Sequence, residues 1–334
     1  MQDKTLILGA AGFIGTNLTL QLIGQNKNLI LFDRPEAVYC PEIQGAKQVQ
    51  IRQGSFTQMQ KEDWKRVLPD FAEVECVYHL ISTTCPTNSN RDIAGELADN
   101  VIGTTHFLDA CVEAGVKKVV FLSSGGTVYG KEHTGLCKEE EEAFPITVYG
   151  MQKLSIEKLL YLYYQLYNLD YRIVRLSNPY GPYQKPNGVQ GAVTTFTYRI
   201  LRDEPITVYG DGSVVRDYIY IADAIEGILT IAEGKGRYKL YNLGSGQGVS
   251  IRELIDTIAE VLHKTPCIRY EAGRKVDVPV NVLDIVRYEQ DFGHRNNIPL
   301  REGIQKLAAF FASRTRASTS SVESLAFFGP KAMS

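Results

Sequence analysis

The stretch Thr5-Leu6-Ile7-Leu8-Gly9-Ala10-Ala11-Gly12-Phe13-Ile14-Gly15 decides the fold of this 334-residue chain. Its apolar run predicts a strand, its three glycines predict a tight turn, and a helical pattern follows to about Gly24. A second apolar run, Leu29 to Phe32, ends at Asp33, which stands 18 residues after Gly15. This spacing is close to that of a βαβ unit that binds a dinucleotide.

The residues of this unit have a physical use in holding a dinucleotide. Glycines let the backbone approach a pyrophosphate, and free N–H groups at the start of the helix bind its charge. Asp33 can accept hydrogen bonds from the adenosine ribose, and its carboxylate repels a 2′-phosphate. The prediction is therefore NAD rather than NADP, although the neighbouring Arg34 softens that discrimination.

Strand-like and helical segments keep alternating along the first third of the chain. Further strands are expected at 49–52, 76–81 and 118–122, and helices at 56–67 and 94–114. This alternation predicts an α/β fold with a doubly wound parallel sheet. His79 is expected to be a hydrogen-bonded core histidine. Asn100 is either a structural cap or a contact that shapes the cofactor site.

Two groups of residues can carry chemistry. Hydroxyl side chains follow the strand at 118–122, at the sheet edge where doubly wound folds bind ligands. Tyr149 and Lys153 are four residues apart at the start of a helix, so both lie on one helical face. A phenol with a pKa of about 10 is a poor base at neutral pH, and a neighbouring ammonium makes it a better one.

With these motifs, the sequence resembles the extended short-chain dehydrogenases/reductases of the nucleotide-sugar epimerase/dehydratase family, in particular UDP-glucose/UDP-N-acetylglucosamine 4-epimerase-type enzymes. The resemblance covers roughly residues 4 to 312. Besides the motifs above, it rests on the stretches 77–80, 100–104, 177–182, 215–219 and 241–244 and on Arg274 with Asp277. It implies a Rossmann sheet with a smaller α/β substrate-binding lobe, bound NAD, and inversion at C4 of a UDP-hexose through a transient 4-keto sugar.

The resemblance also implies a role for each matching residue. Tyr149 would be the base for the sugar 4-hydroxyl, while Lys153 would lower the pKa of Tyr149 and hold the nicotinamide ribose. Arg216 and Arg274 would bind the UDP diphosphate, which suits two guanidinium groups. The implied cofactor-binding residues are Gly9, Gly12, Phe13, Ile14, Gly15, Asp33, Leu80, Asn100, Tyr149 and Lys153, and the substrate-binding residues are Ser124, Gly125, Asn178, Arg216, Arg274 and Asp277.

The chain departs from the family pattern at the catalytic hydroxyl. Counted back from the Val-Tyr-Gly at 128–130, the usual Ser/Thr position is occupied by Gly125. Ser124 is the expected substitute in catalysis, and Ser123 and Thr127 remain alternatives. A second departure is Ser55, where many relatives have an aspartate next to adenine.

Other positions discriminate between reactions and sugars. Dehydratases of the family, and usually its decarboxylases, place acidic residues just before the Val-Tyr-Gly, where this chain has Gly126 and Thr127, so 4-epimerisation is favoured. Asn281 stands where a bulky residue limits the C2 substituent, which favours UDP-GlcNAc and UDP-GalNAc beside UDP-Glc and UDP-Gal. A different nucleotide-sugar oxidoreductase and a non-catalytic NAD-sensing protein remain alternatives.

The organisation of the chain is expected to be interleaved. The NAD-binding domain is predicted at 1–178, with 217–243 returning to it, the substrate lobe at 179–315, and a flexible tail at 316–334. The helix after Tyr149 carries apolar residues on more than one face, which, together with the resemblance, predicts a homodimer built from this helix and the one near 96–114.

Composition excludes several classes of partner. Lys plus Arg is 36 against 38 for Asp plus Glu, a formal charge of −2, so neither a basic field nor a nucleic-acid partner is expected. The six cysteines form no CxxC pair or zinc pattern, so neither disulfides nor a metal are expected. No signal peptide or membrane span is apparent, which predicts a cytoplasmic protein.

Overall fold

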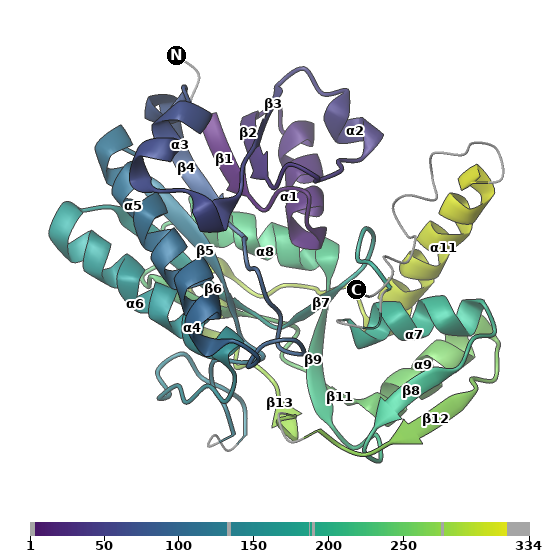
Figure 1. Ribbon diagram of the computed structural model, residues 1–334. Helices are drawn as coiled ribbons and strands as arrows, with labels where there is room; N and C mark the ends of the chain where they lie inside the picture. The colour runs from purple at the N-terminus through teal and green to yellow at the C-terminus, as the bar shows by residue number, and fades with distance from the viewer. Residues whose placement is uncertain (1–3, 132–134, 187, 189–190, 275–276, 319–334) are drawn as a thin grey trace.

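The computed structural model describes residues 4–131, 135–186, 188, 191–274 and 277–318. At its centre is a seven-stranded sheet in the order β10-β6-β5-β4-β1-β2-β3, in which every neighbouring pair is parallel (Figure 1). Its strands are β1 (Lys4–Leu8), β2 (Asn28–Asp33), β3 (Val49–Gln53), β4 (Val74–His79), β5 (Lys118–Ser124), β6 (Asp170–Leu176) and β10 (Leu240–Leu243). The predicted doubly wound parallel sheet is confirmed.

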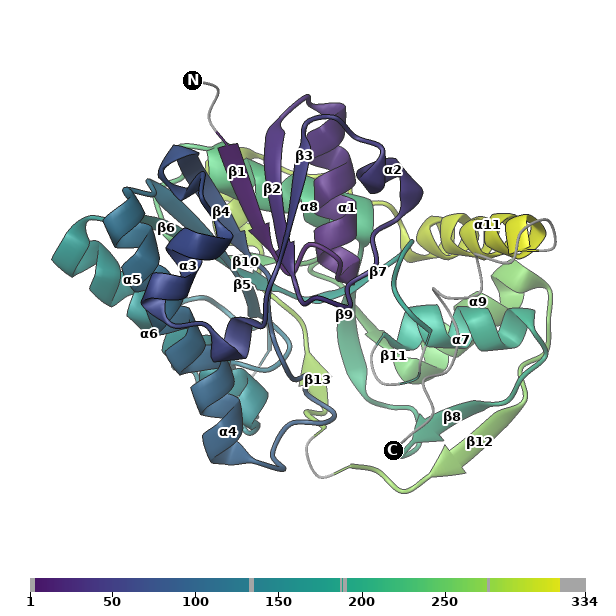
Figure 2. The same cartoon turned by 45° about the horizontal axis from the view of Figure 1, so that its top comes forward.

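Helices cover both faces of this sheet (Figures 1 and 2). One face carries α1 (Phe13–Gly24) and α8 (Ile221–Glu233), with α2 (Pro41–Gln44) beside α1. The other carries α3 (Lys61–Val67), α5 (Gly103–Ala114) and α6 (Val148–Tyr167). The short elements η1 (Phe56–Gln58), η2 (Phe71–Glu73) and α4 (Ile93–Leu97) complete this layer, and the π-helical η3 (Ala98–Ile102) joins α4 to α5.

Two expected helices differ in detail. The helix expected at 56–67 is split at Met59, whose backbone is extended at φ −83° and ψ 127°. This break lets Gln60 and Asp63 form a capping box at the start of α3. The helix expected at 94–114 is continuous but includes the π-helical turn that holds Asn100.

Side chains of the strands alternate between two apolar cores. Ile7 and Leu31 pack into the core under α1 and α8, whereas Leu8 and Phe32 pack into the core under α3, α5 and α6. Burial on both faces is what a parallel sheet requires, and it explains why these strands read as continuous apolar runs.

The remaining elements lie beyond the carboxyl edge of the sheet (Figure 2). They form a small sheet of β7 (Asn178–Tyr180), β9 (Val215–Tyr220), β11 (Gly248–Ser250) and β13 (Val280–Asn281), and a parallel pair of β8 (Ile206–Tyr209) and β12 (Ile268–Glu271). Helices α7 (Ala192–Leu201), α9 (Ile251–Leu262) and α11 (Leu300–Ser318) pack against one another, and α10 (Val286–Phe292) packs on β10.

The segment expected to return to the first domain does so only in part. Helix α8 packs on the main sheet and β10 joins it beside β6. The strand that contains Asp217, however, pairs with β7, β11 and β13 outside the main sheet. The buried Asp217 carboxylate explains its place, because it accepts hydrogen bonds from the Ser245 and Gly246 N–H groups in the loop before β11.

The tail expected at 316–334 overlaps a helix in its first three residues. Helix α11 runs to Ser318, because 315–318 contain neither glycine nor proline to end it. The rest of the expected tail, 319–334, lies outside the described residues. Within the described part of the chain, no helix is long and apolar enough to cross a membrane.

Candidate functional site

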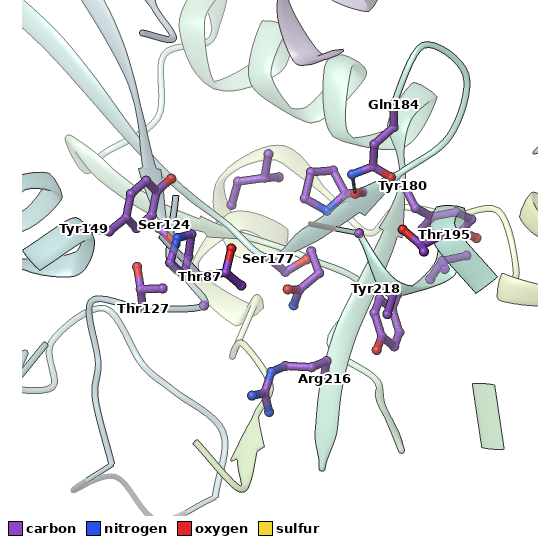
Figure 3. A pocket seen from close by; sticks show the side chains of 18 of the residues that line it. Thr87, Ser124, Thr127, Tyr149, Ser177, Tyr180, Gln184, Thr195, Arg216 and Tyr218 are labelled. Carbon is purple, nitrogen blue, oxygen red and sulfur yellow. Dashed lines mark hydrogen bonds between the residues drawn. The ribbon is translucent and has the colours of Figure 1, made fainter. Parts of the chain in front are cut away.

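A cavity of about 650 Å³ opens at the carboxyl edge of the main sheet, in the size range of small-molecule sites. Gly9 after β1, Leu80 after β4, Ser124 at the end of β5 and Ser177 after β6 line it. Its other wall comes from elements after β7. Tyr149, Ser124 and Thr127 lie at one end, and Arg216 and Tyr218 at the other (Figure 3). This is the edge at which doubly wound sheets bind ligands.

The glycine turn forms the floor of the cavity beside β1. The Gly9 N–H donates to the Phe32 carbonyl oxygen at 2.9 Å, which ties the turn to β2. A Cβ atom on Gly15 would lie 2.2 Å from the Gly9 oxygen, so only glycine allows helix α1 to start this close to the turn. The first turn of α1 carries no acid. All five residues expected here line the cavity: Gly9, Gly12, Phe13, Ile14 and Gly15.

Asp33 stands at the end of β2, beside the turn. Its carboxylate accepts hydrogen bonds from the Ala11 N–H at 2.9 Å and the Arg34 N–H at 2.9 Å. The Arg34 guanidinium pairs with Glu36 at 3.3 Å and is 65% exposed. Asp33 therefore fixes the turn itself, and its side chain is not part of the cavity lining. The turn, the acid-free start of α1 and Asp33 together fit the phosphates and adenosine ribose of a dinucleotide.

The two other residues expected at the cofactor differ in position. Leu80 lines the cavity, whereas the buried Asn100 does not. The Asn100 amide accepts from the Thr83 N–H at 3.0 Å and donates to the Thr83 hydroxyl at 2.7 Å. Asn100 is not a helix cap, because it lies inside the π-helical turn η3. It fixes the loop after β4, whose Ser82 and Thr84 line the cavity, and its cofactor contact stays a prediction.

The start of α6 is held by the loop that follows β4. Thr147 caps the helix by accepting from the Gly150 N–H, and the Tyr149 N–H donates to the Ser89 hydroxyl at 2.8 Å. Ser89 in turn donates to the buried Glu96 carboxylate at 3.0 Å, which also accepts from the Asn90 N–H at 3.0 Å. Glu96 thus fixes the loop against which the backbone of Tyr149 rests.

Lys153 lies one turn after Tyr149, as the spacing predicts. Its Nζ is 5.7 Å from the centre of the Tyr149 ring and donates to the Leu122 carbonyl oxygen at 2.9 Å. Burial lowers the pKa of Lys153 to about 8, against an opposing effect of Glu157. Burial also raises the pKa of Tyr149 above its ordinary value. Burial of Tyr149 thus opposes the effect expected of the ammonium, whose hydrogen bond goes to the backbone, and the lowering of the Tyr149 pKa by Lys153 stays a prediction.

The hydroxyl groups near Tyr149 are not equivalent. The Ser123 hydroxyl donates to Glu157 at 2.5 Å and is therefore occupied. Ser124 lines the cavity at the end of β5. Thr127 also lines it, and its buried Oγ1 has no hydrogen-bond partner among the described residues. Of the three alternatives, Ser124 and Thr127 are the ones whose hydroxyls remain available to a ligand.

Gly125 is backed by apolar core rather than by the cavity. A Cβ atom there would lie 2.6 Å from Cδ1 of the buried Leu283, and Gly125 is not part of the lining. The Gly125 carbonyl oxygen accepts from Asn281 Nδ2 at 3.1 Å. Asn281 is itself buried and does not line the cavity. Leu283, from a distant part of the chain, therefore occupies the space that a side chain at position 125 would need.

The other end of the cavity carries the cationic groups. Arg216 donates to the carbonyl oxygens of Val215 at 2.8 Å and Val278 at 2.6 Å, and burial lowers its pKa. The Arg274 guanidinium stacks on Tyr209, 3.9 Å from the ring centre, and pairs with Asp277 at 3.5 Å. The cavity is lined by Arg216, Arg274, Tyr209 and Asp277. Asn178 lines it too, and its amide donates to the Asp217 carbonyl oxygen at 2.9 Å.

Among the lining residues that were not predicted, three have hydroxyl groups that are unpaired within the described part of the chain. The buried hydroxyl oxygens of Ser177, Thr195 and Tyr218 have no hydrogen-bond partner among the described residues. Buried polar groups are normally paired, so these atoms are what a bound polar ligand would satisfy. Ser177 and Tyr218 lie inside stretches that carry the family resemblance, whereas Thr195 lies in α7 and has no such signal.

Comparisons with known proteins agree with this geometry. A dTDP-4-dehydro-6-deoxyglucose reductase of Escherichia coli is 31% identical over 312 residues, 92% of this chain and 96% of that protein. A UDP-glucose 4-epimerase of Mycolicibacterium smegmatis is 29% identical over 313 residues, 94% of this chain and 100% of that protein.

Solved structures are similar over the same length. The UDP-glucose 4-epimerase of Thermotoga maritima with UDP-glucose has a TM-score of 0.86 at 30% identity, covering 93% of this chain and 99% of that chain. The UDP-glucose 4-epimerase of Thermus thermophilus in complex with NAD has a TM-score of 0.84 at 29% identity, covering 92% and 99%. The model of the NAD dependent epimerase/dehydratase family matches residues 5–244. The chain therefore belongs to the NAD dependent epimerase/dehydratase family, with NAD as its cofactor.

Proposed function

We propose that this protein inverts C4 of a UDP-hexose with NAD as a tightly held cofactor. One observation carries the proposal: a single cavity holds Tyr149 and Ser124 at one end and Arg216 at the other (Figure 3), and Arg274, whose charge acts on Arg216, belongs to the same lining. A nucleotide sugar has the matching chemistry, with reacting hydroxyls at one end and a diphosphate at the other. The similarity to UDP-glucose 4-epimerases over nearly the whole chain supports this assignment.

The groups near β5 would transfer the proton of the sugar 4-hydroxyl. The glycine turn from Gly9 to Gly15 would hold NAD, which when bound would supply the hydride chemistry at C4 of the sugar. Tyr149 would take the proton of the 4-hydroxyl and give it back, while Ser124 donates a hydrogen bond to the same oxygen. The Lys153 ammonium would stabilise the phenolate as it forms, which offsets the unfavourable effect of burial.

The groups of the opposite wall would hold the nucleotide. Arg216 and Arg274 suit the diphosphate, because guanidinium groups make charge-assisted and bidentate bonds to phosphate. The backbone carbonyls of Val215 and Val278 fix Arg216 before a ligand arrives. Asp277 would accept from the uridine ribose, and Asn178 would contact the sugar. Holding the nucleotide firmly leaves the sugar free to present either face to the cofactor.

We further propose that N-acetylhexosamines are accepted. Asn281 occupies the position at which a bulky side chain would limit the C2 substituent. The position of this side chain supports the proposal. Asn281 is buried and donates a hydrogen bond to the Gly125 carbonyl oxygen, so its side chain takes up no space in the cavity.

A cytoplasmic homodimer is the proposed state of the protein. The second half of helix α6 exposes four large side chains, Tyr161 at 55%, Leu162 at 46%, Leu166 at 61% and Tyr167 at 53%. An apolar surface of this kind on a long helix is typical of an interface. Light scattering of the purified protein measures this directly, and a monomer at micromolar concentration would contradict it.

The experiment that tests the function is incubation with UDP-GlcNAc and UDP-glucose without added nicotinamide. A C4 epimer without net NADH supports the epimerase. Accumulating NADH would indicate an oxidoreductase, and a dehydrated sugar would indicate a dehydratase. A protein that binds NAD yet turns over neither sugar, with or without added NAD, would indicate a sensor; its NAD binding should then be the same in Tyr149→Phe.

A further inference from the structure

A buried ion pair joins helix α6, which carries Tyr149, to strand β6 and has no part in the proposed mechanism. Arg175, on β6, donates from Nε to Glu157 Oε1 at 3.0 Å and from Nη2 to Oε2 at 2.7 Å. The two side chains are only 5% and 2% exposed. Because desolvation offsets most of the attraction in such a pair, stability alone is a weak reason for having it.

The position of Glu157 links the pair to Lys153. Tyr149, Lys153 and Glu157 are spaced four residues apart on α6, so they lie on one face of the helix. The Lys153 Nζ is packed 4.8 Å over the Phe121 ring, away from water. From β4, His79 faces the same region, but burial and the nearby Lys153 lower its pKa to about 3, so it is neutral. Glu157 therefore supplies the negative charge that favours the ammonium of Lys153.

The same carboxylate controls the end of β5. The Ser123 hydroxyl donates to Glu157 Oε1, the oxygen that also accepts from Arg175. Arg175 stacks on the Tyr129 ring at 4.8 Å, and Tyr129 donates to Asn242 at 2.6 Å. The pair thus fixes β5 on one side of Ser124 and the loop to Tyr129 on the other.

We propose that Glu157, held by Arg175, positions the reacting groups by keeping Lys153 protonated and by anchoring Ser123 so that Ser124 faces the cavity. Neither residue of the pair lines the cavity, so both are positioning residues. The inference rests on the proposed function only in assigning Tyr149, Lys153 and Ser124 to the reaction.

The test measures the protonation of Lys153 without turnover. The full-length protein is labelled with 13Cε-lysine, its NMR resonances are followed against pH, and the Lys153 resonance is assigned by its loss in Lys153→Met. A midpoint near 8 is expected in the parent protein. In Glu157→Gln the midpoint should fall by about one pH unit, because removing a negative neighbour disfavours the ammonium. An unchanged midpoint overturns the proposal.

Two further variants keep the result decisive. Glu157→Gln/Arg175→Met leaves no unpaired buried charge, so it should fold if the single variant does not. Its midpoint should also fall, by less than in Glu157→Gln, because the positive charge of Arg175 is removed together with the negative charge of Glu157. Arg172→Met removes an arginine of the same strand that pairs with Asp170, and it should leave the midpoint unchanged.

Activity gives an independent readout. In Glu157→Gln the alkaline limb of the kcat/KM profile for UDP-glucose should shift to lower pH by as many pH units as the NMR midpoint. If Glu157 had a purely structural role, the substitution would reduce kcat/KM at every pH and leave the midpoint of the alkaline limb unchanged. That result contradicts the proposal. If the midpoint moves in a protein that does not epimerise either sugar, the positioning of Lys153 stands and the proposed function fails.

Discussion

The ammonium nitrogen of Lys153 lies 5.7 Å from the centre of the Tyr149 ring, and its hydrogen bond goes to the Leu122 carbonyl oxygen. The lysine therefore acts on the tyrosine through space as a charge. A charge of this kind is effective only while the amine is protonated. Because burial lowers the Lys153 pKa to about 8, this charge is lost close to physiological pH.

The pH dependence follows from that value. Lys153 is an ammonium below pH 8 and loses its charge as the pH rises through 8, so kcat/KM should decline above about pH 8. Initial rates from pH 6 to 10 measure this. In Lys153→Arg the charge persists because the guanidinium does not deprotonate, and the decline near pH 8 should disappear from whatever activity remains. A parent profile that stays flat to pH 10 would contradict the assignment.

Removal of single hydroxyls should separate Ser124 from its neighbours. Ser124→Ala should lower kcat by about 100-fold, since it removes a donor to the reacting oxygen. Thr127→Val should have a smaller effect on kcat and mainly raise KM, because Thr127 is a second lining hydroxyl without a partner. Steady-state kinetics on matched preparations compare them. Equal kcat in Ser124→Ala and the parent protein would assign the role elsewhere.

Restoring the usual family hydroxyl at position 125 should be harmful. In Gly125→Ser the new Cβ meets Leu283 at 2.6 Å, so the free energy of unfolding should fall by about 1–3 kcal/mol and kcat should not rise. Urea unfolding measures the loss. Adding Leu283→Ala makes room for the Cβ, so Gly125→Ser should cost less in that background than in the parent. Equal costs in both backgrounds would show that the contact does not matter.

The loop after β4 should control the placement of Tyr149. Glu96→Ala removes the acceptor of Ser89 and Asn90, so kcat should fall about 10-fold and exchange of the Tyr149 amide hydrogen should accelerate. Glu96→Gln keeps an acceptor oxygen, so it should retain most of the kcat and most of the protection of the Tyr149 amide hydrogen from exchange. Hydrogen exchange with mass spectrometry and kinetics provide the two readouts. Slow exchange in Glu96→Ala would argue against this role.

Local sequence patterns predicted the parts of the site formed by neighbouring residues. The turn at Gly9 to Gly15, Asp33 at the end of β2, and the pairing of Tyr149 with Lys153 all depend on spacing within one βαβ unit or one helical turn. The resemblance placed Arg216 and Arg274 in the same cavity, where the structure also has them.

Contacts between distant segments were beyond those patterns. Leu283 packs behind Gly125, and Glu157 reaches both Ser123 and Arg175, which belong to different strands. The sequence left two roles open for Asn100, a helix cap and a cofactor contact. Its hydrogen bonds to Thr83 join separate segments and could be identified only in the folded structure. The pKa of Tyr149 depends on how deeply the ring is surrounded, which no sequence motif encodes.

The most direct test of C4 inversion is a proton NMR time course of the purified protein with UDP-GlcNAc and, separately, UDP-glucose, without added nicotinamide. If the protein inverts C4, the anomeric signal of the C4 epimer should appear and reach a steady ratio, with no free NADH. Tyr149→Phe should slow this conversion by about 100- to 10,000-fold while NAD binding is retained. Unchanged spectra for both sugars with NAD supplied, from a protein that binds NAD, would contradict the proposed function.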